Sequence, residues 1–223
     1  ADDLVVTSWN IAAINNNPFE YWITYDENPK YTKLMEDIEA FVESPGEKDV
    51  SVAEIFSQTM FEELIEEMKK IGWSGLDRVT EHWNSDYKTR KIISGFLKDK
   101  TIGAKRLASM PDRFTNTITL AEPEGAQICR PTVINVYEAN TMNSIPSWFA
   151  AWKEFIFENN TTIKEKDGSV TSKKIFQLFP KILKAKYPAI SEEEEEISIP
   201  LQVLCLAIFD CILLHMMISV SGI

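Results

Sequence analysis

The sequence predicts an α/β protein of the α+β kind, in which strands and helices alternate over residues 1–140 and helices dominate residues 141–223. Short apolar and β-branched runs, bounded by polar residues, are typical of strands. Longer segments repeat apolar residues every three to four positions, as helices do. After Asn143 only the helical pattern continues. We therefore expect the second region to be an insertion or a subdomain that packs on the first.

Four segments of the first region have the composition of β-strands. Val, Ile and Thr dominate them, and polar residues, Pro or Gly follow. In the second segment the alternation places Glu54 on the same face as Val50 and Val52. Pro and Gly between the last two segments predict a hairpin-like connection. The expected strands are residues 4–9, 49–56, 115–120 and 131–138.

Apolar residues spaced three and four apart predict helices in both regions. Thr59 and Glu62 fit a capping box near the start of the second helix, and Gly72 fits its C-terminal end. Pro180 falls inside a later helix, where it would produce a kink. Residues 110–112 are expected to be a loop. The expected helices are residues 32–43, 58–71, 75–83, 144–158, 171–186 and 200–218, with a further ordered segment near 88–98.

The last apolar segment, residues 199–223, has no Lys, Arg or Glu and resembles a membrane span. Asp210 interrupts it, and a charged Asp at the centre of a bilayer costs about 3 kcal/mol. The acidic run 192–196 lacks the basic flank of a cytoplasmic boundary. We therefore expect a buried core helix, with a membrane anchor as the alternative. A buried Asp210 then needs a hydrogen-bond partner, such as a backbone group or a Tyr.

The charge balance limits the class of partner. The 223 residues include 34 acidic and 23 basic side chains, for a net charge of −11. Such a surface repels a nucleic-acid backbone, although a divalent metal could still hold a single phosphate. The three cysteines form no C-x-x-C pair or disulfide framework, which favours a reducing compartment. No signal peptide is visible, so we expect a cytoplasmic or nuclear protein that does not associate with membranes.

Polar side chains follow two of the expected strands. Asn10 comes at the end of the first and Glu54 at the end of the second. Strand ends in α/β sheets open onto a common crevice, and amide and carboxylate oxygens suit Mg²⁺. Such a metal would polarise a phosphoryl oxygen and help generate hydroxide. The structural alternatives are a carboxylate at a helix N-terminus for Glu54 and a turn residue for Asn10.

Three stretches carry a resemblance to the endonuclease/exonuclease/phosphatase superfamily, which has the DNase I-like fold. "LVVTSWNIAA", residues 4–13, resembles the opening strand of this family, which is apolar and ends in Trp-Asn. "DVSVAEIFSQTMFEELIEEMKKIGW", residues 49–73, resembles the second motif, a strand with the metal-binding glutamate followed by a helix and a Gly-aromatic pair. "RPTVINVYEAN", residues 130–140, resembles the strand that normally reads Val-Asn-Thr-His-Leu. Asn135 keeps the asparagine, and Tyr137 stands where the catalytic histidine belongs.

The resemblance covers residues 4–138 and implies a partial DNase I-like sheet. It implies an Mg²⁺-dependent phosphoesterase or nuclease-like hydrolase, with Asn10, Glu54 and Asn135 in the catalytic site and Mg²⁺ on Asn10 and Glu54. The substrate would be a phosphate ester. The family's Gly-Asp-x-Asn and terminal Ser-Asp-His motifs do not occur in this sequence. The resemblance therefore describes an incomplete or degenerate catalytic domain.

Three further residues are candidates for substrate contact. Arg113 and Asn116 enter the third expected strand, where a guanidinium could hold a phosphate through a forked hydrogen bond. Tyr137 would face the same crevice. The structural alternative for Arg113 is a surface ion pair with the neighbouring Asp112.

A different class of function is a non-catalytic helical module for protein interaction, which would bind a partner through residues 144–223. The missing catalytic motifs are what this hypothesis predicts. Trp148, Trp152 and Phe155 form an aromatic stripe, expected to pack in the core or, alternatively, to line a groove for the partner.

Overall fold

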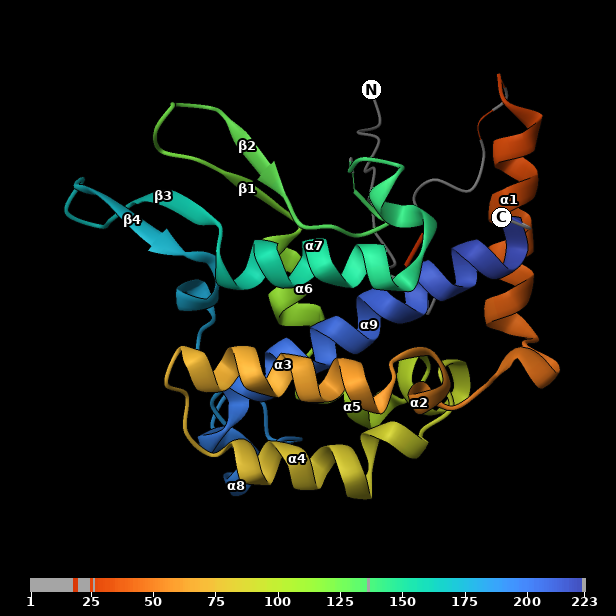
Figure 1. Ribbon diagram of the computed structural model, residues 1–223, viewed down its shortest axis with the longest axis horizontal. Coiled ribbons are helices and arrows are strands. Elements are labelled where there is room, and N and C mark those ends of the chain that lie inside the picture. Colours follow the sequence, from red (N-terminus) through yellow and green to blue (C-terminus); the bar gives the residue numbers. More distant parts are fainter. Residues whose placement is uncertain (1–17, 20–24, 26, 136, 222–223) are drawn as a thin grey trace, which may run out of the picture.

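The computed structural model describes residues 18–19, 25, 27–135 and 137–221 (Figure 1). Helical residues make up 58% and strands 9% of the structure, which confirms the α+β class. The helices are α1 (Pro29–Glu43), α2 (Val52–Ile55), α3 (Gln58–Lys70), α4 (Leu76–Ser85), α5 (Lys100–Lys105), α6 (Ser109–Thr115), α7 (Ile145–Phe157), α8 (Glu192–Glu196) and α9 (Ser198–Ser221). Short helical turns are η2 (Gly46–Lys48), η3 (Tyr87–Thr89), η4 (Ile93–Leu97), η5 (Thr141–Asn143) and η6 (Ile175–Leu178).

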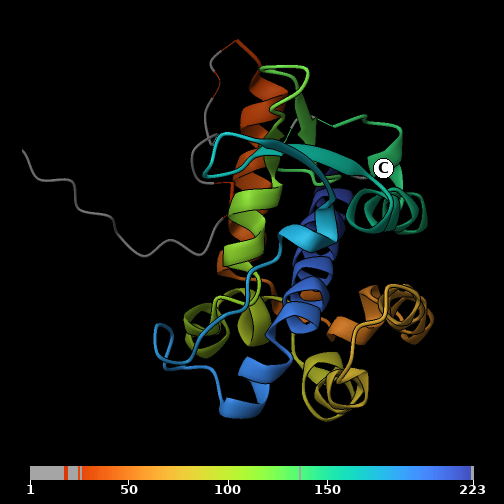
Figure 2. The same cartoon turned by 90° about the vertical axis from the view of Figure 1, so that its left-hand side faces the viewer.

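Helix α9 is the centre of the fold. It crosses the molecule obliquely, with α7 on one side and α3 and α4 on the other (Figures 1 and 2). It also contacts α1, α2, α6 and α8. A helix that is apolar on all sides must be covered on all sides. Helix α9 has the length and hydropathy of a membrane span. However, 67% of its most apolar 18-residue stretch is buried inside the protein, as a core helix requires.

Aromatic rings join the helices that surround α9. Phe61 of α3 stacks on Trp83 of α4 with ring centroids 4.8 Å apart. Phe56 packs edge-on against Trp83 and, at 5.5 Å, against Phe149 of α7. Trp148, Trp152 and Phe155 of α7 are buried. The prediction that this stripe packs in the core is therefore confirmed.

Two antiparallel hairpins project to one side of the helices, at the left in Figure 1. The first pairs β1 (Thr117–Thr119) with β2 (Gln127–Cys129), and the second pairs β3 (Asn160–Lys164) with β4 (Val170–Lys174). The backbone N–H of Ala121 donates to the carbonyl of Thr162 at 2.9 Å, which joins the hairpins. The described residues contain no larger sheet than these two-stranded ones.

The expected strand over residues 49–56 is wrong, because α2 occupies its second half. Ser51 and Glu54 form a capping box, in which the backbone N–H and the hydroxyl of Ser51 both donate to Glu54 Oε1 at 2.8 Å. The Ser-x-x-Glu signature of such a box is present in the sequence, but the period-2 alternation obscured it. The expected capping box at Thr59 is also wrong, since Ser57 caps α3 by accepting from the N–H of Met60.

Other expected elements are wrong in part. The described residues of the expected strand 131–138, which exclude residue 136, form bends and a turn, and α6 replaces the expected loop at 110–112. In place of a helix over 171–186, the chain forms β4 and the turn η6. The expected strand 115–120 is reduced to Thr117–Thr119. The expected helices 32–43, 58–71, 75–83, 144–158 and 200–218 are confirmed, with ends shifted by a few residues. The expected strand 4–9 lies outside the described residues.

Candidate functional site

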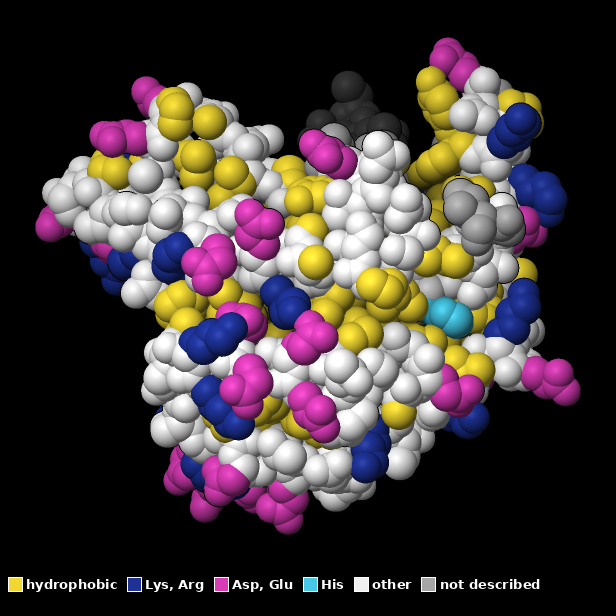
Figure 3. All heavy atoms as spheres, viewed as in Figure 1, with side chains coloured by type: hydrophobic (Ala, Val, Ile, Leu, Met, Phe, Trp, Pro, Cys, Tyr) yellow, Lys and Arg dark blue, Asp and Glu magenta, His cyan; other side chains and the backbone are white. Residues whose placement is uncertain are grey.

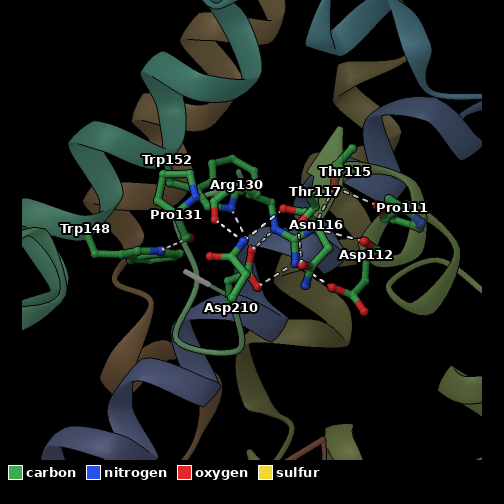
Figure 4. Close-up of polar contacts among 11 residues, drawn as sticks. Pro111, Asp112, Thr115, Asn116, Thr117, Arg130, Pro131, Trp148, Trp152 and Asp210 are labelled. Atoms are coloured by element: carbon green, nitrogen blue, oxygen red, sulfur yellow. Dashed lines mark hydrogen bonds and ion pairs between the residues drawn. The ribbon is translucent and has the colours of Figure 1, made fainter. Parts of the chain in front are cut away.

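A buried polar cluster around Arg130 lies where β2 ends, beside α6, α7 and α9 (Figure 4). The side chains of Arg130 and Asp210 are both fully buried. Arg130 Nε donates to Asp210 Oδ2 at 2.7 Å, and Nη2 donates to Asp210 Oδ1 at 3.1 Å. The pair therefore has the forked geometry that is strongest between a guanidinium and a carboxylate.

All five N–H donors of the Arg130 guanidinium are used. Besides Asp210, Nη2 reaches Asp112 Oδ1 at 2.6 Å, and Nη1 reaches Thr115 Oγ1 at 2.6 Å and the Asp112 carbonyl at 3.3 Å. No donor is left for a substrate. The cluster therefore holds α6, α9 and the end of β2 together, and we assign it a structural role.

The aspartate of this cluster is also saturated. Trp152 Nε1 donates to Asp210 Oδ2 at 2.8 Å, which adds α7 to the elements that the cluster joins. Burial raises the pKa of Asp210, while the Arg130 guanidinium acts in the opposite direction. Burial acts to lower the pKa of Arg130, but the carboxylates of Asp210 and Asp112 outweigh it and leave that pKa raised. The prediction of a buried, hydrogen-bonded Asp210 is confirmed, although its partners are Arg130 and Trp152.

Two of the predicted site residues, Asn116 and Asn135, meet beside this cluster, where the Asn135 side chain binds main-chain carbonyls. Asn135 Nδ2 donates to the carbonyls of Arg130 at 2.5 Å and Asn116 at 2.9 Å. The Asn116 carbonyl also accepts from the Arg130 N–H at 3.0 Å. Asn135 thus fixes the loop that follows β2. Tyr137 lies two residues after Asn135 in the sequence and is half-buried. This burial raises the pKa of Tyr137.

Glu54 lies apart from this cluster, next to the C-terminal half of α9. Its Oε1 atom accepts both hydrogen bonds from Ser51, and these bonds lower its pKa. Burial lowers the pKa of the half-buried His215, and the Glu54 carboxylate opposes that effect. The side chain of Glu54 is exposed. The structural interpretation of Glu54, a carboxylate at a helix N-terminus, is therefore confirmed.

The residues present give Mg²⁺ few ligands. Glu54 Oε2 makes no hydrogen bond to a described residue, so it could bind a cation. Asn10, its expected partner, lies outside the described residues. Among the residues that the structure describes, no group of three or more His, Cys, Asp or Glu side chains is placed to hold a metal.

Arg113 is exposed and lies at a small hollow between α6 and the segment that precedes α8. The expected alternative, an ion pair with Asp112, is wrong, because Asp112 turns inward to Arg130. A separate hollow of about 140 Å³ lies on the other side of Ser109, lined by Phe96, Ile102, Phe209 and other mainly apolar residues. A third, of about 350 Å³, lies between α1 and the last turn of α9.

Residues 49–222 match a family described as a domain of unknown function, DUF8234. The chain belongs to this family. Comparison with curated proteins and with solved structures gave no match.

The match begins just before α2 and runs to the end of α9, so the family is defined by the helical core and both hairpins. The Arg130 cluster lies wholly within it, whereas Asn10 and α1 precede it. The sequence contains a signal for this cluster: Arg130 ends the second strand of a hairpin and is the only basic residue between positions 114 and 152.

Proposed function

We propose that the helical region is a non-catalytic interaction module that binds an acidic segment of a partner protein through residues 160–190, here named the basic strip. The observation that carries this proposal is a reversal of charge. The basic strip has seven lysines and two acidic residues, in a chain with a net charge of −11. Complementary potentials of this kind guide protein association.

Three lysines of the basic strip are available to a partner. Lys164, Lys166 and Lys181 are exposed and form no ion pair with a described residue. In Figure 3, Lys and Arg side chains lie along the lower edge of the β3–β4 hairpin, at the left of the view. Val170 and Leu183 are exposed by 40% and 48% of their surface. Apolar side chains among lysines favour a protein partner over a bare polyanion.

The binding of fluorescent poly-L-glutamate at low salt tests this proposal. Lys164→Gln, Lys166→Gln and Lys181→Gln together should weaken binding by about fivefold, because each exposed charge contributes a few tenths of a kcal/mol at low ionic strength. A matched triple variant outside the basic strip, Lys30→Gln, Lys88→Gln and Lys91→Gln, has the same net charge and should bind like the parent chain. Equal losses in the two triples would refute the basic strip as the binding surface.

A second candidate function is the Mg²⁺-dependent phosphoesterase. Two features favour it: the resemblance of residues 4–13 to the DNase I-like opening strand, and the free Oε2 atom of the exposed Glu54. In this proposal residues 4–13 belong to a DNase I-like sheet and Glu54 binds the metal, which activates water against a phosphate ester.

Hydrolysis of bis(p-nitrophenyl) phosphate distinguishes this candidate. The Mg²⁺-dependent part of the rate should disappear in Glu54→Ala and persist in Glu47→Ala, which removes an exposed carboxylate nearby in sequence. Equal rates with and without Mg²⁺ in all three proteins would exclude the phosphoesterase for this chain and leave the interaction module.

A further inference from the structure

The hollow beside α6 is lined by Arg106, Ser109, Met110, Arg113 and Tyr187 and has a volume of about 110 Å³. The end of α5 and the start of α6 form one wall, and the chain before α8 forms the other. Phe114 packs edge-on against Phe179 at 5.3 Å, which holds the two walls together. This contact ties the backbone of the two walls together near the hollow, while the side chains of Arg106 and Arg113 are exposed.

The two arginines of the hollow differ from the rest. The chain has five arginines, and Arg78, Arg90 and Arg130 each form an ion pair with a carboxylate. In the described part of the chain, the guanidinium groups of Arg106 and Arg113 form neither an ion pair nor a hydrogen bond. In a chain with 34 acidic residues, two neighbouring unpaired arginines indicate a place kept for an anion.

Two further groups add to this positive site. Ser109 Oγ is buried and has no hydrogen-bond partner among the described residues, and a buried hydroxyl without a partner is costly unless something else supplies one. Lys186 Nζ lies 5.4 Å from the centre of the Tyr187 ring, so a third cation is close to the rim. No carboxylate lines the hollow.

Arg106 occupies this place at a conformational cost. It follows α5 with a φ of +62°, in the left-handed region where glycine is favoured. A glycine would end α5 without strain, but it would remove the guanidinium from the hollow. The sequence therefore keeps the charged side chain in a backbone conformation that disfavours it.

We propose that this hollow binds the phosphate group of a small phosphate monoester. Two guanidinium forks match the oxygens of a phosphate dianion, and the Ser109 hydroxyl supplies a further donor. The volume is well below the roughly 300–1,000 Å³ of pockets that enclose whole ligands. It therefore admits one phosphate, while the rest of the ligand lies outside, next to Tyr187. This site shares Lys186 and Tyr187 with the end of the basic strip, but its phosphate-binding groups are Arg106, Arg113 and Ser109, which lie outside the strip.

Isothermal titration with inorganic phosphate in a low-chloride buffer tests the site. The parent chain and Lys30→Gln, which removes a distant exposed charge, should show the same saturable binding. Arg106→Gln and Arg113→Gln should each weaken binding by about tenfold or more, as expected for a charge-assisted hydrogen bond. Ser109→Ala should weaken it by a smaller factor, and Arg113→Lys, which keeps the charge without the fork, should fall between. Thermal melting of each variant establishes that it is folded.

Phenyl phosphate and vesicles that contain phosphatidic acid separate a soluble ligand from a lipid headgroup. Phenyl phosphate should bind at least as tightly as inorganic phosphate, and the arginine variants should lose both. The proposal would be overturned if the parent chain showed no saturable phosphate binding, or if Arg106→Gln and Arg113→Gln bound like the parent. Binding to the vesicles alone would also overturn it, since the ligand would then be a membrane surface and not a soluble monoester.

Discussion

The core around α9 and the basic strip use charged residues in opposite ways. At α9, Arg130 and Asp210 are fully buried, and every donor of the guanidinium has an acceptor. In the basic strip, Lys164, Lys166 and Lys181 are exposed and have no carboxylate partner among the described residues. The first set is committed to the fold, whereas the second is free for a partner.

This difference separates stability from function in the molecule. A buried ion pair need not stabilise a protein relative to apolar residues, but losing one member leaves an unpaired charge in the core. Exposed lysines contribute little to stability. Variants in the two regions should therefore fall into two classes, one that changes the free energy of unfolding and one that changes binding alone.

The largest effect should come from Asp210→Asn. It removes the negative charge that faces Arg130 while keeping the shape of the side chain, so Arg130 keeps only the partly exposed Asp112 as a charged partner. We expect a loss of about 3–5 kcal/mol in the free energy of unfolding, measured by urea denaturation.

Two controls identify the cause of this loss. Asp112→Asn should cost less than Asp210→Asn, because 23% of the Asp112 side chain is exposed and water can replace part of the interaction. The double variant Arg130→Met, Asp210→Leu should be more stable than Asp210→Asn, since it removes both fully buried charges and leaves only the partly exposed Asp112 carboxylate without its partner. If the double variant were the least stable of the three, the ion pair itself would be a net source of stability.

Trp152→Phe should have the next largest effect. It deletes the indole N–H that donates to Asp210 Oδ2 at 2.8 Å and leaves a small void beside a fully buried ring. A lost hydrogen bond to a charged group and a small cavity together predict a cost of about 2 kcal/mol. Trp148→Phe is the matched comparison, because its indole N–H donates to the uncharged carbonyl of Pro131. Equal costs in the two variants would contradict a special role for the charged acceptor.

The sequence was sufficient to predict most of the long helices. Helices α1, α3, α4 and α7 show an apolar face with a period near 3.6, and α9 is apolar throughout, so each was visible without tertiary information. Short elements were not predictable in the same way. In residues 49–56 the alternation of Val50 and Val52 imitated a strand, but the local hydrogen bonds between Ser51 and Glu54 start a helix.

The polar sites depend on contacts between distant residues, and no spacing in the sequence reveals these. Arg130 and Asp210 are 80 residues apart, and the hollow joins Arg106 and Arg113 to Tyr187. Arg113 was predicted to contact a phosphate from its place near a strand, and that role is still a prediction. Asn135 was assigned to catalysis by resemblance, but in the structure its amide holds the backbone of Arg130 and Asn116.

His215 is half-buried, at the point where α9 approaches the surface. Its contribution to the free energy of unfolding should be smaller than those of Asp210 and Trp152, and it should depend on pH. Burial lowers its pKa from the ordinary value of 6.5. The unfolded chain therefore binds a proton more readily than the folded one, and the free energy of unfolding should fall as the pH drops below about 6.5, until the folded state is protonated too. His215→Gln should flatten this fall in stability below pH 6.5.

His82→Gln is the matched control for this experiment, since the sequence contains only these two histidines. The drop in stability below pH 6.5 should persist in this variant. The hydrogen bonds that Glu54 accepts from Ser51 do not contribute to this pH dependence. They lower the pKa of Glu54, so their contribution to stability is lost only below the ordinary pKa of 4.5. A pH dependence that survived His215→Gln would assign the effect to another group.

The smallest change in stability should come from the basic strip, and it is the sharpest test of the comparison. Lys164→Gln with Lys166→Gln removes two exposed charges at the turn of the β3–β4 hairpin, where neither lysine is paired with a described residue. The free energy of unfolding should change by no more than about 0.5 kcal/mol, while the affinity for poly-L-glutamate falls. A loss of stability above about 1 kcal/mol would mean that these lysines hold the hairpin in place, and the basic strip would then be part of the fold in the same sense as the Arg130 cluster.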